Sequence, residues 1–131
     1  MPVTSLYPVL MSDDVARATA FYRDSIGFEV VFESDWYVSM RMGDFELAII
    51  ARDHGTIPDG YRMTSRGVIV NLEVDDVDDV HERLTEKLGL TPIAAIRDED
   101  FGQRHFILAA PDGVLLDIIQ PIPPRGEYAE A

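Results

Sequence analysis

The sequence has no cysteine, and its 11 basic residues include a single lysine, Lys87. Without cysteine, disulfides, thiolate nucleophiles and iron–sulfur ligation are excluded, and we expect a cytoplasmic location. Residues 1–10 have no basic stretch before an apolar core, so no signal peptide is expected. No apolar run approaches the ~18 residues that a membrane span requires, which argues against a membrane partner.

Several motifs are also missing. The chain has no G-x-G-x-x-G, Walker A, H-E-x-x-H or G-x-S-x-G sequence, so we expect no dinucleotide or other cofactor and no zincin or serine-hydrolase site. Acidic residues outnumber basic ones 24 to 11, which gives a net charge of −13. Such a surface repels nucleic acid and attracts cations, including basic small molecules.

An internal repeat is the most informative feature that is present. Asp13-Asp14-Val15 begins a helical pattern that ends at Gly27, and Asp75-Asp76-Val77 begins another that ends at Gly89 after the same number of residues. The carboxylates suit helix N-caps, and glycine suits the left-handed C-cap. The repeat predicts two structurally equivalent helices.

Runs typical of β-strands accompany both helices. In residues 68–74, apolar side chains alternate with a mixed set, which predicts a strand with one fully apolar face. The strand-like runs are residues 6–11, 29–33, 36–42, 45–51, 68–74, 91–96, 104–110 and 114–120. The fold class predicted is therefore α+β, with two tandem βαβββ modules.

The predicted organisation is one domain over residues 1–131. Module one covers about residues 1–53, a linker residues 54–66, module two residues 67–120, and a proline-rich tail residues 121–131. A single module would leave one sheet face uncovered, so the modules should pair, within one chain or across two. The apolar faces should carry the helices, and the mixed faces should form a cupped sheet around a cleft.

The segments 12–22, 26–28 and 74–78, followed by Gly102-Gln103-Arg104-His105-Phe106 and Pro111-Asp112-Gly113, resemble the vicinal-oxygen-chelate superfamily of glyoxalases, bleomycin-resistance proteins and extradiol dioxygenases. The resemblance covers nearly the whole chain except the tail. It implies a cupped sheet around a ligand cavity, commonly in a homodimer.

The same resemblance implies four metal-ligand positions, on the first and last strands of each module. By the repeat, these are Tyr7, Ala48, Ile69 and Asp117. Alanine and isoleucine cannot coordinate a metal, and a neutral phenol is a poor ligand. One carboxylate does not match the three or so protein ligands typical of catalytic zinc, so we expect no metal.

The three histidines have different surroundings. His54 falls in the linker and should be solvated, and His81 lies in an acidic helical run and should face solvent. His105 lies in a strand, where it is either a packed sheet histidine or a hydrogen-bonding residue or weak base of the cleft. A nearby Asp117 would raise its pKa.

Each remaining candidate either occupies a strand position whose side chain should face the expected cleft, or carries an aromatic ring. With His105, the predicted ligand-binding residues are Tyr7, Trp36, Glu46, Asn71, Glu73 and Asp117. For the carboxylates, the alternative is the solvent-facing half of an ordinary sheet. For Trp36 it is core packing.

These observations favour a protein that binds a small molecule, such as a cationic antibiotic or metabolite, in a metal-free cleft. The alternative is a glyoxalase-like lyase, isomerase or dioxygenase that uses Asp117, Glu73 or His105 with an atypical metal site. A third possibility is a regulatory or accessory module with an empty cleft. Fold alone does not decide among them.

Overall fold

The computed structural model describes residues 1–130, and the chain forms two compact units. Unit 1 consists of Met1–Arg66 together with Pro111–Gly113, and unit 2 consists of Gly67–Ala110 and residues 114–130. Each described unit has one α-helix and one four-stranded mixed sheet, as the predicted βαβββ modules require, and Pro111–Gly113 adds a short 3₁₀ turn to unit 1. The predicted tail ends at Ala131, which lies outside the described residues.

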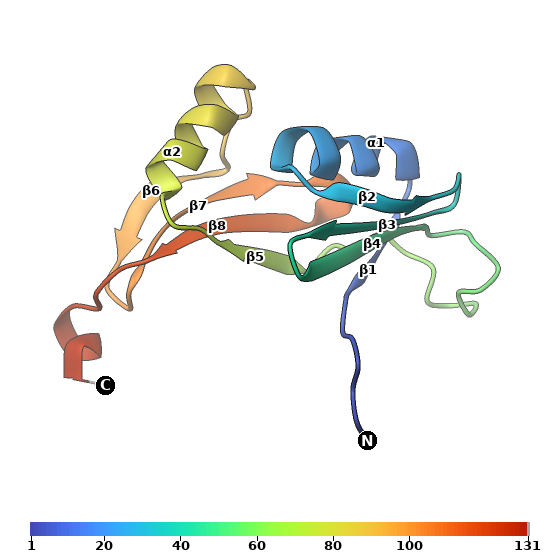
Figure 1. The fold of residues 1–131 in the computed structure, drawn as a ribbon, viewed down its shortest axis with the longest axis horizontal. Coiled ribbons are helices and arrows are strands. Elements are labelled where there is room, and N and C mark those ends of the chain that lie inside the picture. Colours follow the sequence, from blue (N-terminus) through green and yellow to red (C-terminus); the bar gives the residue numbers. More distant parts are fainter. Residues whose placement is uncertain (131) are drawn as a thin grey trace. The chain divides into compact units, whose positions relative to one another are not determined.

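Unit 1 carries its sheet in the order β1-β4-β3-β2 (Figure 1). Its elements are β1 (Val9–Ser12), α1 (Val15–Ala20) with a π-helical continuation (Phe21–Ile26), β2 (Glu29–Glu33), β3 (Tyr37–Met42) and β4 (Phe45–Ala51). Strands β2, β3 and β4 form an antiparallel meander, and β1 joins β4 in parallel. A two-residue turn joins β3 to β4, where Gly43 supplies the positive φ of 60°.

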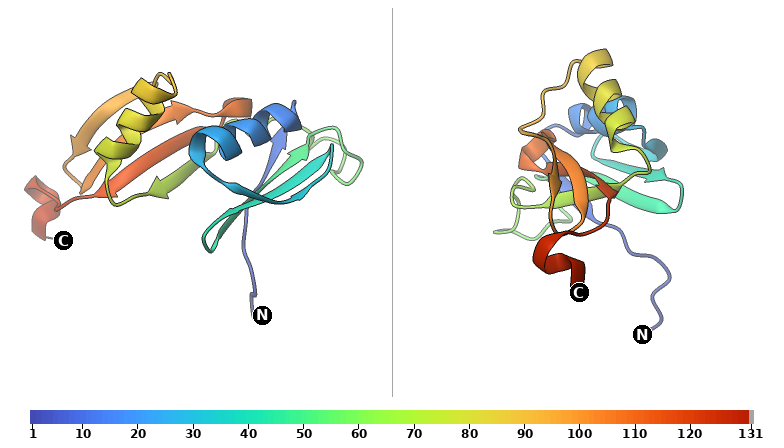
Figure 2. Two further views of the ribbon diagram at one scale, coloured as in Figure 1. Left: turned by 45° about the horizontal axis from the view of Figure 1, so that its top comes forward. Right: turned by 90° about the vertical axis from the view of Figure 1, so that its left-hand side faces the viewer.

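Unit 2 repeats this arrangement with the order β5-β8-β7-β6. Its elements are β5 (Ile69–Glu73), α2 (Val77–Glu82) with a π-helical continuation (Arg83–Lys87), β6 (Ala94–Glu99), β7 (Gln103–Ala109), β8 (Leu115–Pro121) and a C-terminal 3₁₀ helix (Gly126–Glu130). In each unit taken by itself, the helix lies on one face of the sheet (Figure 2).

The strand registers are equivalent in the two units. Val9 pairs with Ala48 across the parallel β1–β4 ladder. The positions that correspond to them by the repeat, Asn71 and Asp117, pair across the parallel β5–β8 ladder. The internal repeat in the sequence is therefore a repeat of structure down to individual residue pairs.

Both helices begin as the sequence predicts. The side chain of Asp14 accepts a hydrogen bond of 3.1 Å from the Arg17 amide, and that of Asp76 accepts one of 3.1 Å from the Asp79 amide. These bonds satisfy amides that have no partner within the helix. The first helix ends at Gly27, which adopts the left-handed conformation with φ 105°.

Each unit has its own apolar core beneath the helix. In unit 1, Ala18 and Tyr22 are buried together with Met40 of β3 and Ile49 of β4. In unit 2, the equivalent layer includes Leu84, Phe106, Leu116 and Ile118, all fully buried. Burying a side chain of this size contributes about 1.5–3 kcal/mol, so the helix-facing side of each sheet is fixed by hydrophobic burial.

Two strands are displaced from their predicted ranges, and proline accounts for both. The first strand begins at Val9, after Pro8, instead of at residue 6. Strand β6 covers Ala94–Glu99 instead of residues 91–96, since Pro92 interrupts the expected run. Proline has no N–H group to donate to a ladder. Within the described residues, no helix is long and apolar enough to cross a membrane.

Candidate functional site

The structure divides the seven predicted ligand-binding residues between the two units. Tyr7, Trp36 and Glu46 belong to unit 1, whereas Asn71, Glu73, His105 and Asp117 belong to unit 2.

In unit 2, the central residue is His105, which lies on β7 between two carboxylates. Its Nδ1 is 2.8 Å from Oδ1 of Asp117 on β8, and its Nε2 is 2.8 Å from Oε2 of Glu99 on β6. The exposed fractions of the side chains are only 12% for His105, 12% for Asp117 and 19% for Glu99. The antiparallel ladders on both sides of β7 position this triad, which we call the His105 cluster.

The hydrogen bonding of His105 favours its protonated form. A neutral imidazole has one N–H donor, so it can satisfy only one of the two carboxylates, whereas an imidazolium satisfies both. Burial disfavours the charged ring, but the hydrogen bonds with Glu99 and Asp117 outweigh it, so the pKa of His105 lies above its usual value. When His105 is protonated, its imidazolium can donate to both carboxylates of the cluster.

Glu99 has a second cationic neighbour. Nε of Arg97, on the same strand, lies 2.7 Å from Oε2 of Glu99. The hydrogen bonds from His105 and Arg97 together lower the pKa of Glu99. Neither Glu99 nor Arg97 was predicted as a site residue, because this strand was expected to end at residue 96. Extending the strand to its observed end would have placed Glu99 on the hairpin beside His105.

The other two predicted residues of unit 2 are not part of the His105 cluster. Asn71 is exposed and pairs with Asp117 across the parallel ladder. Glu73 is exposed and pairs with Ile119, which in turn pairs with His105. Two strand spacings place Glu73 about 10 Å from the histidine backbone. Of the four predicted residues of unit 2, the structure brings together only His105 and Asp117, and their role in ligand binding stays a prediction.

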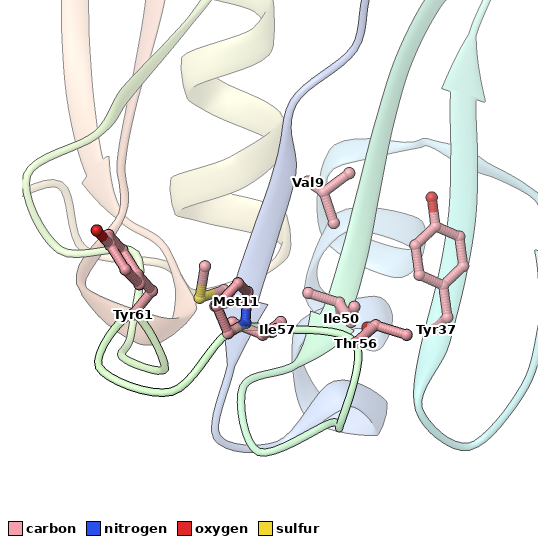
Figure 3. A pocket seen from close by; sticks show the side chains of 8 residues that line it. Val9, Met11, Tyr37, Ile50, Thr56, Ile57 and Tyr61 are labelled. Carbon is pink, nitrogen blue, oxygen red and sulfur yellow. The ribbon is translucent and has the colours of Figure 1, made fainter.

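Unit 1 contains a hollow of about 510 Å³. It is lined by Val9, Met11, Tyr37, Ile50, Thr56, Ile57, Pro58 and Tyr61. The first four come from β1, β3 and β4, on the sheet face opposite α1, and the others come from the loop after β4 (Figure 3). The wall is hydrocarbon and tyrosine, with one threonine hydroxyl, a composition typical of small-molecule sites.

The three predicted residues of unit 1 lie around Tyr37, one of the lining residues. Burial, the neighbouring Tyr7 hydroxyl and the charge of Glu46 raise the pKa of Tyr37. Oε2 of Glu46 accepts a hydrogen bond of 2.8 Å from Ser5. The ring centroid of Trp36 is 5.7 Å from that of Tyr37. Tyr7 and Glu46 therefore border Tyr37, although neither lines the hollow itself.

In unit 1, the loop that follows β4 was the main part of the site missing from the predicted residues. It was predicted to be the linker between the two modules, yet it supplies half of the lining residues, and Ile57 is buried. His54, expected in solvent, stacks on Trp36 with centroids 3.7 Å apart. His81, also expected in solvent, packs against Phe106 in unit 2 with centroids 4.8 Å apart. The apolar residues of the linker, Ile57 and Tyr61, were the signal that it packs on a sheet.

The metal-ligand positions implied by the resemblance do not fit a metal. Ala48 is fully buried hydrocarbon, and Ile69 is also hydrocarbon. Tyr7 offers a phenol, and the carboxylate of Asp117 is bound to His105. Among the described residues, no three His, Cys, Asp or Glu side chains gather in a way that could hold a metal ion.

The two βαβββ units and the sheet orders define the class of protein. The Glyoxalase/Bleomycin resistance protein/Dioxygenase superfamily model matches residues 5–118. The chain belongs to this superfamily. Comparison with curated proteins gave no significant match.

Solved structures of the same fold are similar along nearly their whole length. A lactoylglutathione lyase from Agrobacterium tumefaciens has a TM-score of 0.74 and 23% identity, covering 91% of this chain and 95% of its own. A glyoxalase/bleomycin resistance protein/dioxygenase from Nocardioides has a TM-score of 0.78 and 18% identity, covering 97% and 89%. A bleomycin resistance determinant encoded on transposon Tn5 has a TM-score of 0.67 and 25% identity, covering 91% and 98%.

Proposed function

We propose that this chain binds a flat, partly apolar small molecule in the hollow of unit 1 without using a metal ion. The observation that carries the proposal is the hollow itself. Its volume of about 510 Å³ is within the range of sites for drug-sized ligands, and its wall is apolar except for two tyrosines and a threonine. Tyrosine rings offer flat contact area and a polar tip that can orient a guest.

The proposed ligand is cationic, such as a basic antibiotic or metabolite. A net charge of −13 attracts cations and speeds their arrival. Glu46 lies close enough to Tyr37 to affect the pKa of its phenol, so a carboxylate borders the hollow. The Tn5 structure, a bleomycin resistance determinant, offers a functional analogy within the same fold.

Thermal shift and calorimetry with basic glycopeptide and aromatic antibiotics test the proposal. The Tyr61→Ala variant removes a lining ring that is 68% exposed, so it should leave the fold intact. We expect it to weaken binding about tenfold, equivalent to ~1.4 kcal/mol. Tyr128→Ala, which removes an exposed ring of unit 2, is the matched control and should bind normally. If no compound raises the melting temperature at high excess, the sequestration proposal fails.

The His105 cluster supports a second candidate, a glyoxalase-like lyase, isomerase or dioxygenase. In this candidate, His105, held between two carboxylates, acts as the positioned acid, and Asp117 or Glu73 acts as the base. Elemental analysis of protein purified from metal-supplemented cultures distinguishes the two candidates. Stoichiometric nickel, zinc, manganese or iron would favour the enzyme and contradict metal-free binding.

A further inference from the structure

The hollow depends on how the loop is held. Thr56, Ile57, Pro58 and Tyr61 form one wall, and these four residues all come from the segment 54–61 that follows β4. The opposite wall is the face of the sheet (Figure 3). If the loop moved away from the sheet, half of the lining would be lost. Contacts that fix the loop therefore determine the shape of the hollow.

A stacked ring pair fixes the first residue of this loop. The rings of Trp36 and His54 are nearly parallel, at 7°, with centroids 3.7 Å apart. Neither side chain lines the hollow. The backbone brings them together, because the Ala51 amide donates to the Trp36 carbonyl at 2.8 Å and the His54 amide donates to the Ala51 carbonyl at 3.0 Å. The stack thus joins the start of the loop to the start of β3.

His54 also contacts the wall directly. Its Nδ1 lies 2.9 Å from Oγ1 of Thr56, and its carbonyl accepts a hydrogen bond of 3.1 Å from the Ile57 amide. Both partners line the hollow. A displacement of the His54 ring from Trp36 therefore acts directly on Thr56, and a displacement of the His54 backbone acts on Ile57.

The far end of the loop is held differently. Arg62 donates from Nε to the Ile57 carbonyl at 2.8 Å, and Ser65 donates to the Met11 carbonyl at 3.0 Å. Gly55 and Gly60 lie between the two attachments, and Gly60 adopts a positive φ of 88° that other residues rarely adopt. At its first end, the loop is held by the Trp36–His54 stack and by the hydrogen bond from the His54 amide to the Ala51 carbonyl. Without the stack, we expect the loop to open at this end while the sheet stays folded.

We propose that the Trp36–His54 stack is an affinity-determining latch, which holds the loop closed and sets how long the hollow retains its ligand. The inference rests on the proposed function, because it concerns the same hollow. Trp36 and His54 act through the loop and are positioning residues. Opening the latch is expected to speed ligand dissociation more than it slows association, as is usual for changes within one site.

The sequence contains a single tryptophan, so fluorescence from Trp36 reports on the latch without labelling. The probe is N-phenyl-1-naphthylamine, a neutral, flat, apolar fluorophore that can accept energy from tryptophan. Stopped-flow measurement of its dissociation is made for the unaltered chain and for His54→Ala. We expect the probe to dissociate from the variant about tenfold faster, a rate change equivalent to ~1.4 kcal/mol. We also expect the Trp36 emission of the variant to be shifted to the red.

Two further variants separate the latch from a general loss of structure. His54→Phe retains a stacking ring and should restore the slow dissociation. His81→Ala removes a histidine that contacts an aromatic ring in unit 2, and it should leave both the dissociation rate and Trp36 emission unchanged. If His54→Ala fails to fold, His54→Gln makes the same test.

The outcomes separate the latch from the proposed function. If Tyr61→Ala weakens probe binding but His54→Ala changes neither dissociation nor emission, the latch is wrong and the hollow remains the site. If Tyr61→Ala has no effect on the probe, the hollow is not the site, and both proposals are overturned. Faster dissociation in His54→Ala, together with slow dissociation in His54→Phe, supports the latch.

Discussion

His105 has both ring nitrogens within 2.8 Å of carboxylate oxygens, an arrangement that only the imidazolium satisfies completely. Its two partners come from different strands, and all three side chains are largely shielded from solvent. Loss of the proton would leave one carboxylate facing a lone pair in a poorly solvated position. At the residue scale, this histidine therefore links the protonation state of unit 2 to its stability.

The pKa of His105 is raised in the folded protein, so protonation stabilises the fold. This contribution should be fully present below the unfolded pKa of about 6.5 and should disappear as the pH rises through the folded pKa. Urea unfolding across this range, with NMR titration of the ring, measures the effect. His105→Gln should remove this component of the pH dependence. An identical stability profile in the variant would contradict the assignment.

At the element scale, the two helices show how a short sequence pattern becomes a structural repeat. The second aspartate of each Asp-Asp pair caps its helix, and in both cases the chain then continues into a π-helical turn. Neither α-helical segment exceeds 6 residues, and a helix of this length is too short to be stable alone. Capping and burial against the sheet together make these helices form.

We expect Asp14→Ala and Asp76→Ala each to destabilise the protein by about 1 kcal/mol, because each leaves a helix N-terminal amide without its partner. Chemical denaturation with a circular dichroism readout gives the difference in unfolding free energy. Glu86→Ala, in the π-helical part of the second helix and outside its first turn, is the control and should be nearly neutral. Equal losses in all three variants would show that the caps have no special role.

At the scale of the whole molecule, the two properties to consider are the net charge and the oligomeric state. Each sheet carries its helix on one face, and large apolar side chains remain exposed, including Phe32, Phe45 and Ile69. Exposed apolar surface of this kind favours association. The homodimer expected from the superfamily resemblance is consistent with it and stays a prediction.

Sedimentation at micromolar concentration should give a mass twice that of one chain, and the dimer should persist at high salt if apolar contacts hold it together. Salt should affect ligand association and dimerisation differently. The association rate of a basic ligand should fall as salt screens the net charge of −13. A monomeric mass at every concentration tested would contradict the dimer prediction.

The sequence by itself determined the repeat, the helix ends and the equivalence of positions such as Ala48 and Asp117, because alternation, caps and glycines act over a few residues. It named His105 and Asp117 as separate candidates whose interaction depended on the cleft, and the structure places them in contact. The extent of β6 was predicted less well, because one proline displaced the strand, and Glu99 was missed with it.

Only the tertiary structure decided which distant groups meet. The His105 cluster depends on three strands in register, and the hollow depends on a loop folding back over β1 and β4. The Trp36–His54 stack joins residues that no local pattern relates. Local sequence specifies backbone conformation, but the packing of a loop on a sheet is a balance of burial and chain entropy over the whole unit, and that balance has no short-range signature.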